Sequence, residues 1–279
     1  MMSKTDWLGP EHVVLSHFSL GAQPFKTRCA AAGAAGFDAI GLLHRDYLQL
    51  TNDGYTPSDL IELAATHNLQ IVEIEAAPGW SAKGASDNEI QKMEVCLEMA
   101  AVFSARHLTA MGSFNGTIEE AAQGFARLCD RAAETGTQVG LEPIPVQETE
   151  SIAIAREIVE RAGRSNGGIC VDSWHLVRGG NHWDQLESLP GELVVSIQIN
   201  DGPQEPEHDQ YIEDCLINRR LCGEGEFDLI RFVKTLDRIG ATAPYSVEII
   251  SSDLWAMDPF VVAQQMADTT RTVLYEARK

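Results

Sequence analysis

The stretch Gly140-Leu141-Glu142-Pro143-Ile144-Pro145 follows the run Gln138-Val139 and ends a short β-type segment on a carboxylate. Two prolines come directly afterwards, and proline has no backbone N–H to donate to a sheet. The sequence therefore predicts that a strand ends here, with Glu142 at its carboxyl end.

The same arrangement, a buried-type strand that ends on a polar side chain, recurs three more times. Gly168-Ile169-Cys170-Val171 ends on Asp172, Val194-Val195-Ser196-Ile197 leads to Gln198 and Asp201, and Tyr245-Ser246-Val247 leads to Glu248. Four such strand ends predict one shared polar site.

The whole chain alternates short apolar segments with helical patterns. Expected strands cover residues 13–18, 39–42, 68–74, 106–109, 138–141, 167–171 and 193–199, with an eighth from about 244. Expected helices cover residues 24–35, 87–103, 117–135, 151–162, 183–186, 228–239 and 258–276, and one more begins near Thr56-Pro57. This alternation without a break in composition predicts a single (β/α)₈ TIM barrel over residues 1–279. The longest irregular segment, 201–226, is expected to hang over the carboxyl mouth of the barrel.

Composition restricts the partners and the compartment. The formal charge is −20, which disfavours binding to nucleic acid and to anionic membranes. No apolar run reaches the roughly 20 residues that span a bilayer, and the first residues lack a signal-peptide core. The six cysteines form no C-x-x-C pair. We therefore expect a cytoplasmic protein with ordinary buried thiols.

Three carboxylates in one cavity repel one another unless a positive charge compensates them. Oxygen ligands of this kind favour one divalent cation, with Mn²⁺ as the first choice and Mg²⁺ or Co²⁺ as alternatives. The plainer alternative is that each acid caps a helix or pairs with a base.

Further candidates lie close to the expected mouth. His175, three residues after Asp172, could orient a ligand, carry a proton or simply bond the backbone. His17 and Trp174 follow expected strands and could contact substrate, although packing roles would explain both. The Arg219-Arg220 pair could bind an anion or pair with nearby glutamates.

Together, several motifs resemble the xylose isomerase-like superfamily of sugar-phosphate isomerases and epimerases. They are Leu141-Glu142-Pro143, Val171-Asp172-x-x-His175, Ile197-Gln198-Ile199-Asn200-Asp201, Gly223-Glu224-Gly225-Glu226-Phe227-Asp228 and Val247-Glu248.

The resemblance implies a role for each matching residue. Glu142, Asp172, Gln198 and Glu248 would be the metal ligands, and the two glutamates would double as the acid/base pair. His175 and Arg220 would contact substrate. Gln198 departs from the histidine of many sugar epimerases and is similar to hydroxypyruvate isomerase-like and 3-dehydroshikimate dehydratase-like members.

These parts predict a metal-dependent isomerase or epimerase that removes a proton beside a carbonyl of a small carbohydrate or keto-polyol, through an enediolate. The alternative is a lyase that uses the same enediolate for dehydration or β-elimination. A non-catalytic barrel and a DNA-binding apurinic endonuclease are competing hypotheses, and the acidic charge argues against the latter. By resemblance, the protein is expected to form a homo-oligomer.

Overall fold

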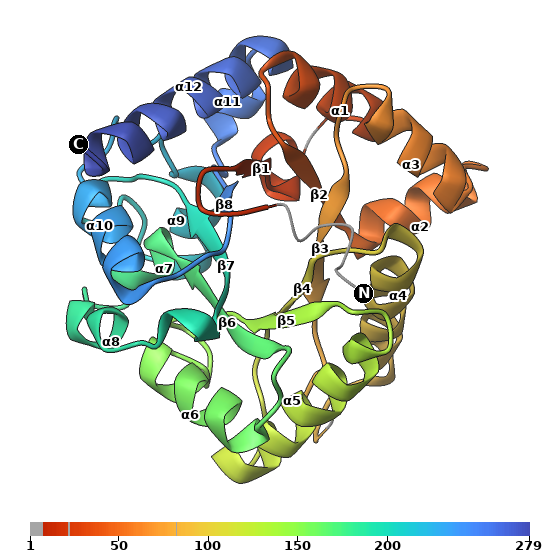
Figure 1. Ribbon diagram of the computed structural model, residues 1–279, viewed down its shortest axis with the longest axis vertical. Coiled ribbons are helices and arrows are strands. Elements are labelled where there is room, and N and C mark those ends of the chain that lie inside the picture. Colours follow the sequence, from red (N-terminus) through yellow and green to blue (C-terminus); the bar gives the residue numbers. More distant parts are fainter. Residues whose placement is uncertain (1–7, 22, 82) are drawn as a thin grey trace.

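Eight short apolar segments pair in parallel and close into a barrel in the computed structural model, which describes residues 8–21, 23–81 and 83–279. Each strand pairs with the next one along the chain, and the last pairs with the first (Figure 1). The strands are β1 (Val13–Leu15), β2 (Ala39–Leu43), β3 (Ile71–Ala77), β4 (His107–Ala110), β5 (Gln138–Leu141), β6 (Gly167–Asp172), β7 (Val194–Ile199) and β8 (Tyr245–Val247). The predicted (β/α)₈ fold is confirmed.

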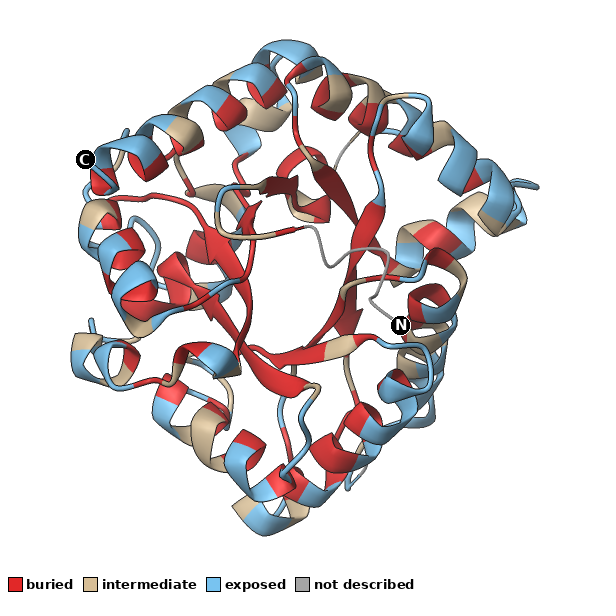
Figure 2. Ribbon diagram, in the orientation of Figure 1, coloured by how far each residue is buried: buried red, intermediate tan, exposed pale blue. Residues whose placement is uncertain are grey.

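Helices surround the strands and bury one face each. Figure 2 shows strands that are almost entirely buried and helices that are exposed on their outer side. Strands covered on both sides read as continuous apolar runs, as a parallel barrel requires. The long helices are α1 (Phe25–Ala34), α3 (Pro57–Ala65), α4 (Asp87–Phe103), α5 (Ile118–Ala133), α6 (Ile152–Ala162), α10 (Leu229–Ile239) and α12 (Pro259–Ala277).

Local sequence sets where several of these helices begin. Thr56 and Thr117 each accept a hydrogen bond from the N–H three residues later, and the acid at that position bonds back. Ser86 does the same for α4. These reciprocal capping boxes satisfy N–H groups that the first turn of a helix leaves unpaired.

The structure departs from the expected elements at three places that bear on the site. β1 ends at Leu15, because Ser16 caps the 3₁₀ helix η1 (His17–Leu20). β3 continues to Ala77 and so includes Glu75. The segment after β7 contains α9 (Tyr211–Ile217), which its irregular composition did not predict.

The remaining helices are α2 (His44–Asn52), α7 (Ser173–Arg178), α8 (Trp183–Glu187), η2 (Gly191–Leu193) and α11 (Ser252–Trp255). Among the described residues, none of the helices has the length and hydropathy needed to cross a bilayer. The expected absence of a leader concerns residues 1–7, which lie outside the described part.

Candidate active site

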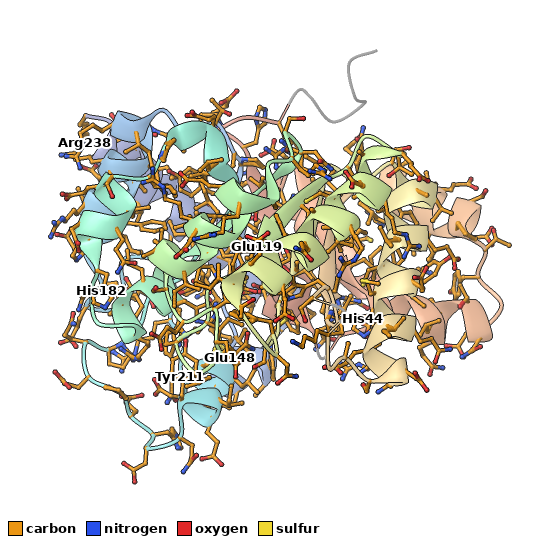
Figure 3. The ribbon with its side chains drawn as sticks, turned by 90° about the horizontal axis from the view of Figure 1, so that it is seen from below. His44, Glu119, Glu148, His182, Tyr211 and Arg238 are labelled. Carbon is orange, nitrogen blue, oxygen red and sulfur yellow. The ribbon has the colours of Figure 1, made fainter. Side chains whose placement is uncertain are left out.

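The four predicted strand-end residues lie at the carboxyl end of the barrel. Asp172 is the last residue of β6, and its Cα pairs in register with that of Gln198 in β7. Glu142 follows β5 directly, and Glu248 follows β8. In the side view of Figure 3, Tyr211 and Glu148 mark this end of the molecule and Arg238 lies toward the other.

A cavity of about 130 Å³ opens among these residues. Its polar lining comprises Glu75, Glu142, Gln147, His175, Tyr211, Arg219 and Glu248. Its apolar lining includes Phe18, Met111, Ile144, Ile212, Leu216 and Ile250. The volume is close to the roughly 150 Å³ of an engineered cavity that admits benzene, so a single ring or a short chain fits.

Arg219 joins two of the predicted ligands. Its Nη1 lies 3.1 Å from Asp172 Oδ2 and 2.7 Å from Glu248 Oε2, and the arginine is only 2% exposed. Trp174 supports the guanidinium from one side, with Arg219 Cζ 5.5 Å from a ring centroid of the indole. A buried positive charge thus offsets part of the carboxylate repulsion.

His175 joins Asp172 to Glu142. Its Nε2 lies 3.2 Å from Glu142 Oε1 and 3.5 Å from Asp172 Oδ2, while its Nδ1 contacts the Tyr211 hydroxyl. Asp172 Oδ1 accepts from the Trp174 N–H at 2.7 Å, so the carboxylate also caps α7. The predicted capping alternative therefore holds for Asp172 without removing it from the cluster.

Gln198 and Glu248 are joined by a hydrogen bond. Gln198 Nε2 donates to Glu248 Oε1 at 3.2 Å, and the Ser16 hydroxyl donates to the same oxygen at 3.3 Å. Burial raises the pKa of Glu248, and the charge of Arg219 opposes that shift because it favours the carboxylate.

The donor set fits a divalent cation. Ligand atoms of Glu142, Asp172 and His175 all lie within 4.8 Å of one another. Gln198 Oε1 is buried and has no hydrogen-bond partner among the described residues. A buried carbonyl oxygen without a partner costs free energy that a cation would recover. The four-residue ligand set stays a prediction, and the geometry adds His175 as a further donor.

Arg220, which the resemblance makes a substrate contact, does not line the cavity. Its side chain is 40% exposed and pairs with Glu207 at 2.9 Å. Residues 218–220 run in an extended conformation, bridging Asp201 on one side and Ser251 on the other. Successive side chains of an extended chain point to opposite sides, so Arg219 faces the acids and Arg220 faces solvent.

His17 and Trp174 also lie away from the cavity lining. His17 is buried, and its Nδ1 accepts from Arg28 Nη1 at 2.5 Å and from the Leu43 N–H at 3.2 Å. The Trp174 ring is fully buried between Arg178, Phe227 and Arg219. Both side chains pack the structure around the site, which is the plainer of the two predicted roles.

Asp201 and the glycine motif are structural as well. The Asp201 carboxylate accepts from the N–H groups of Gly202, Gly223 and Phe227. A Cβ on Gly225 would lie 2.2 Å from Asp201 Oδ1. The Gly223-Glu224-Gly225 turn therefore lets the backbone wrap around one carboxylate, which fixes the path of the chain beyond Arg219 and Arg220.

Among the polar side chains of the cavity, Gln147 and Tyr211 are not predicted from the sequence. Tyr211 reaches His175 from α9, and nothing in the sequence of the segment after β7 signals that contact. Glu75 carried a weaker signal, because it follows the apolar run 71–74 and only the extension of β3 places it in the barrel.

Comparison with known proteins agrees with the barrel fold. Residues 29–272 match the family described as xylose isomerase-like TIM barrel. The chain belongs to that family.

Within this xylose isomerase-like family, a 3-dehydroshikimate dehydratase of Pseudomonas aeruginosa is 25% identical over 89% of this chain. An inosose isomerase of Bacillus velezensis is 24% identical, and the match covers 86% of this chain and 88% of that protein. The crystal structure of an IOLI protein with a bound zinc atom superposes with a TM-score of 0.83 and 21% identity. That superposition covers 95% of this chain and 98% of the other. The chain spans 39% of the length of the Pseudomonas dehydratase.

Proposed function

We propose that this xylose isomerase-like barrel is a divalent-metal-dependent isomerase or epimerase of a small hydroxy-ketone. The observation that carries the proposal is the cluster of Glu142, Asp172 and His175 beside the unpartnered Gln198 Oε1, in a cavity sized for one ring. The zinc in the related IOLI structure supports a divalent ion. Mn²⁺, with Mg²⁺ or Co²⁺ as alternatives, is our choice from the ligand chemistry.

The residues that would hold the ion are Glu142, Asp172, Gln198 and Glu248, with His175 as an additional donor. When bound, the ion would act as a Lewis acid toward the carbonyl and adjacent hydroxyl of the substrate. Arg219 would remain beside Asp172 and Glu248 and balance their remaining negative charge.

Glu142 and Glu248 would exchange protons with opposite sides of a bound substrate. They follow β5 and β8, which β6 and β7 separate in the barrel, and both line the cavity. One carboxylate would remove the proton beside the carbonyl, and the other, once protonated, would return a proton. Return to the opposite face of the same carbon gives epimerisation, and return to the neighbouring carbon gives isomerisation. The Bacillus relative, an inosose isomerase, supports this class of reaction.

A dehydratase or β-eliminase is the second candidate function. The Pseudomonas relative favours it, because a 3-dehydroshikimate dehydratase aligns with 89% of this chain. Loss of a β-hydroxyl or β-alkoxy group from the same enediolate would yield an enone. The cytoplasmic location and a homo-oligomeric assembly stay predictions beside either reaction.

The experiment is proton exchange in D₂O. We expect the Mn²⁺-loaded protein to exchange the C–H beside the carbonyl of at least one member of a panel of ketoses, cyclic polyol ketones and cyclic keto acids, as measured by NMR. A product that absorbs in the ultraviolet as an enone would identify the lyase. Lack of exchange across the panel by protein that binds Mn²⁺ would contradict both reactions.

A further inference from the structure

Glu75 is a buried carboxylate of the cavity that the proposed chemistry does not use. It lies in β3, on the opposite side of the barrel from β7, and it is 1% exposed. Its Oε1 accepts a hydrogen bond from Gln198 Nε2 at 3.1 Å. Glu75 is therefore linked to the predicted ligand shell through one side chain.

The side-chain amide of Gln198 has both of its N–H groups engaged. Gln198 Nε2 lies 3.1 Å from Glu75 Oε1 and 3.2 Å from Glu248 Oε1. Carboxylate oxygens accept hydrogen bonds, so the amide nitrogen faces the two glutamates and the amide oxygen faces away from them. This oxygen, Gln198 Oε1, is the atom left without a partner.

The terminal torsion of glutamine is broad, so its own rotamer preference does not fix which end of the amide points to the metal position. Glu248 alone would be a weak constraint, because Arg219 and Ser16 share its oxygens. Glu75 supplies the second acceptor. Glu75 can accept the hydrogen bond from Gln198 Nε2 whether or not it is ionised, because the carbonyl oxygen of a neutral carboxylic acid also accepts a hydrogen bond.

Burying this carboxylate is costly, which argues against a role as mere filling. The Glu75 side chain is 1% exposed, and the cavity that it lines also contains the carboxylates of Glu142 and Glu248. An apolar side chain of similar volume would avoid that cost.

We infer that Glu75 is a positioning residue for the metal site: it holds the amide of Gln198 with Oε1 turned toward the cation. This inference rests on the proposed function, because it requires a divalent ion at the ends of β5 to β8. Partners that orient a metal ligand in this way typically account for about 10–100-fold in metal affinity.

A double-mutant cycle read by Mn²⁺ affinity tests the inference without any substrate. The dissociation constant is measured by titration calorimetry for wild type, Glu75→Met, Gln198→Leu and the double variant. Glu75→Met should weaken Mn²⁺ binding about 10–100-fold. In the Gln198→Leu background the same change should have little further effect, because the amide through which Glu75 acts is gone.

Two more variants separate orientation from charge and from general stability. Glu75→Gln removes the charge but keeps an oxygen acceptor, so it should bind Mn²⁺ nearly as tightly as wild type. Glu73→Met removes another buried carboxylate of β3, one that accepts from the Ser246 hydroxyl at 2.9 Å. It should leave the Mn²⁺ affinity close to that of wild type, whatever it does to stability.

Different results of the Mn²⁺ titrations would contradict the role of Glu75 and the proposed function. Wild-type protein that binds no Mn²⁺ would overturn the proposed function, and the role of Glu75 with it. If Glu75→Met binds Mn²⁺ as tightly as wild type does, only the orienting role is overturned. The same holds if Glu75→Gln binds Mn²⁺ as weakly as Glu75→Met does. Additive effects of Glu75→Met and Gln198→Leu would also overturn it.

Discussion

Arg219 and Arg220 are adjacent in sequence but differ in environment. Arg219 contacts Asp172 and Glu248 in a buried setting, whereas Arg220 pairs with Glu207 at the surface. Removing one member of a buried charge network leaves the others uncompensated, but an exposed pair contributes little.

We therefore expect Arg219→Met to lower the free energy of unfolding by about 3–5 kcal/mol in the presence of a chelator. Arg220→Met is the matched control and should cost less than about 1 kcal/mol. Urea denaturation measures both. Equal effects of the two substitutions would show that the acid cluster does not depend on Arg219.

His17 gives a prediction about pH. Burial lowers the pKa of His17 well below its ordinary value of 6.5, and Arg28 lowers it further. The unfolded chain therefore binds a proton at this residue at a higher pH than the folded chain does. The stability that the neutral imidazole contributes is present above about pH 6.5 and is lost as the pH falls toward the lower folded-state pKa.

His17→Gln removes this titration while keeping an oxygen acceptor for Arg28 and the Leu43 N–H. The unfolding free energy of wild type relative to this variant should be constant above about pH 6.5. Below about pH 6.5, the unfolding free energy of wild type should fall relative to that of the variant, by at most about 1.4 kcal/mol for each pH unit. Denaturant unfolding at a series of pH values measures it, and a difference that stays constant down to pH 5 would disprove the buried neutral state.

At the scale of elements, the segment that carries Tyr211 and Arg219 is anchored by one arginine. Arg178 in α7 lies 2.8 Å from Asp214 in α9, donates to the carbonyl groups of Pro203 and Gln204, and stacks 4.4 Å from a ring centroid of Trp174. This anchor is buried, so its loss should loosen the segment while the barrel strands keep their pairing.

Hydrogen exchange tests this anchor. In Arg178→Met, the backbone amides of α9 should exchange roughly tenfold faster or more, with little change in β5 to β8. Arg231→Met is the control, because Arg231 also stacks 4.4 Å from a tryptophan ring, that of Trp183, but its ion pair with Glu187 is exposed. Unchanged exchange in α9 would contradict the anchoring role.

The strands and the segment after β7 also show what sequence could predict. Glu142, Asp172, Gln198 and Glu248 could be placed because each lies at or next to the end of a strand that is visible in the apolar pattern, and parallel strands end at one edge. Tyr211 and the choice between Arg219 and Arg220 could not be placed. Tyr211 lies in α9, which the sequence did not predict. The directions of the two arginines depend on bridges that join Arg220 to Asp201 and Asn218 to Ser251, and these carry no periodic signal.

At the scale of the whole molecule, the barrel brings a cluster of acids into one cavity of a chain that already carries a formal charge of −20. Arg219 and His175 are the basic residues among those that line this cavity. A divalent cation would supply the remaining positive charge, and this requirement is the central claim on which both candidate reactions depend.

Anomalous diffraction from a crystal soaked in Mn²⁺ tests that claim most directly. We expect a strong peak among the side chains of Glu142, Asp172, Gln198 and Glu248, with oxygen ligands at about 2.0–2.6 Å. A soaked crystal whose manganese lies elsewhere, or that shows no peak at the ends of β5 to β8, would contradict it.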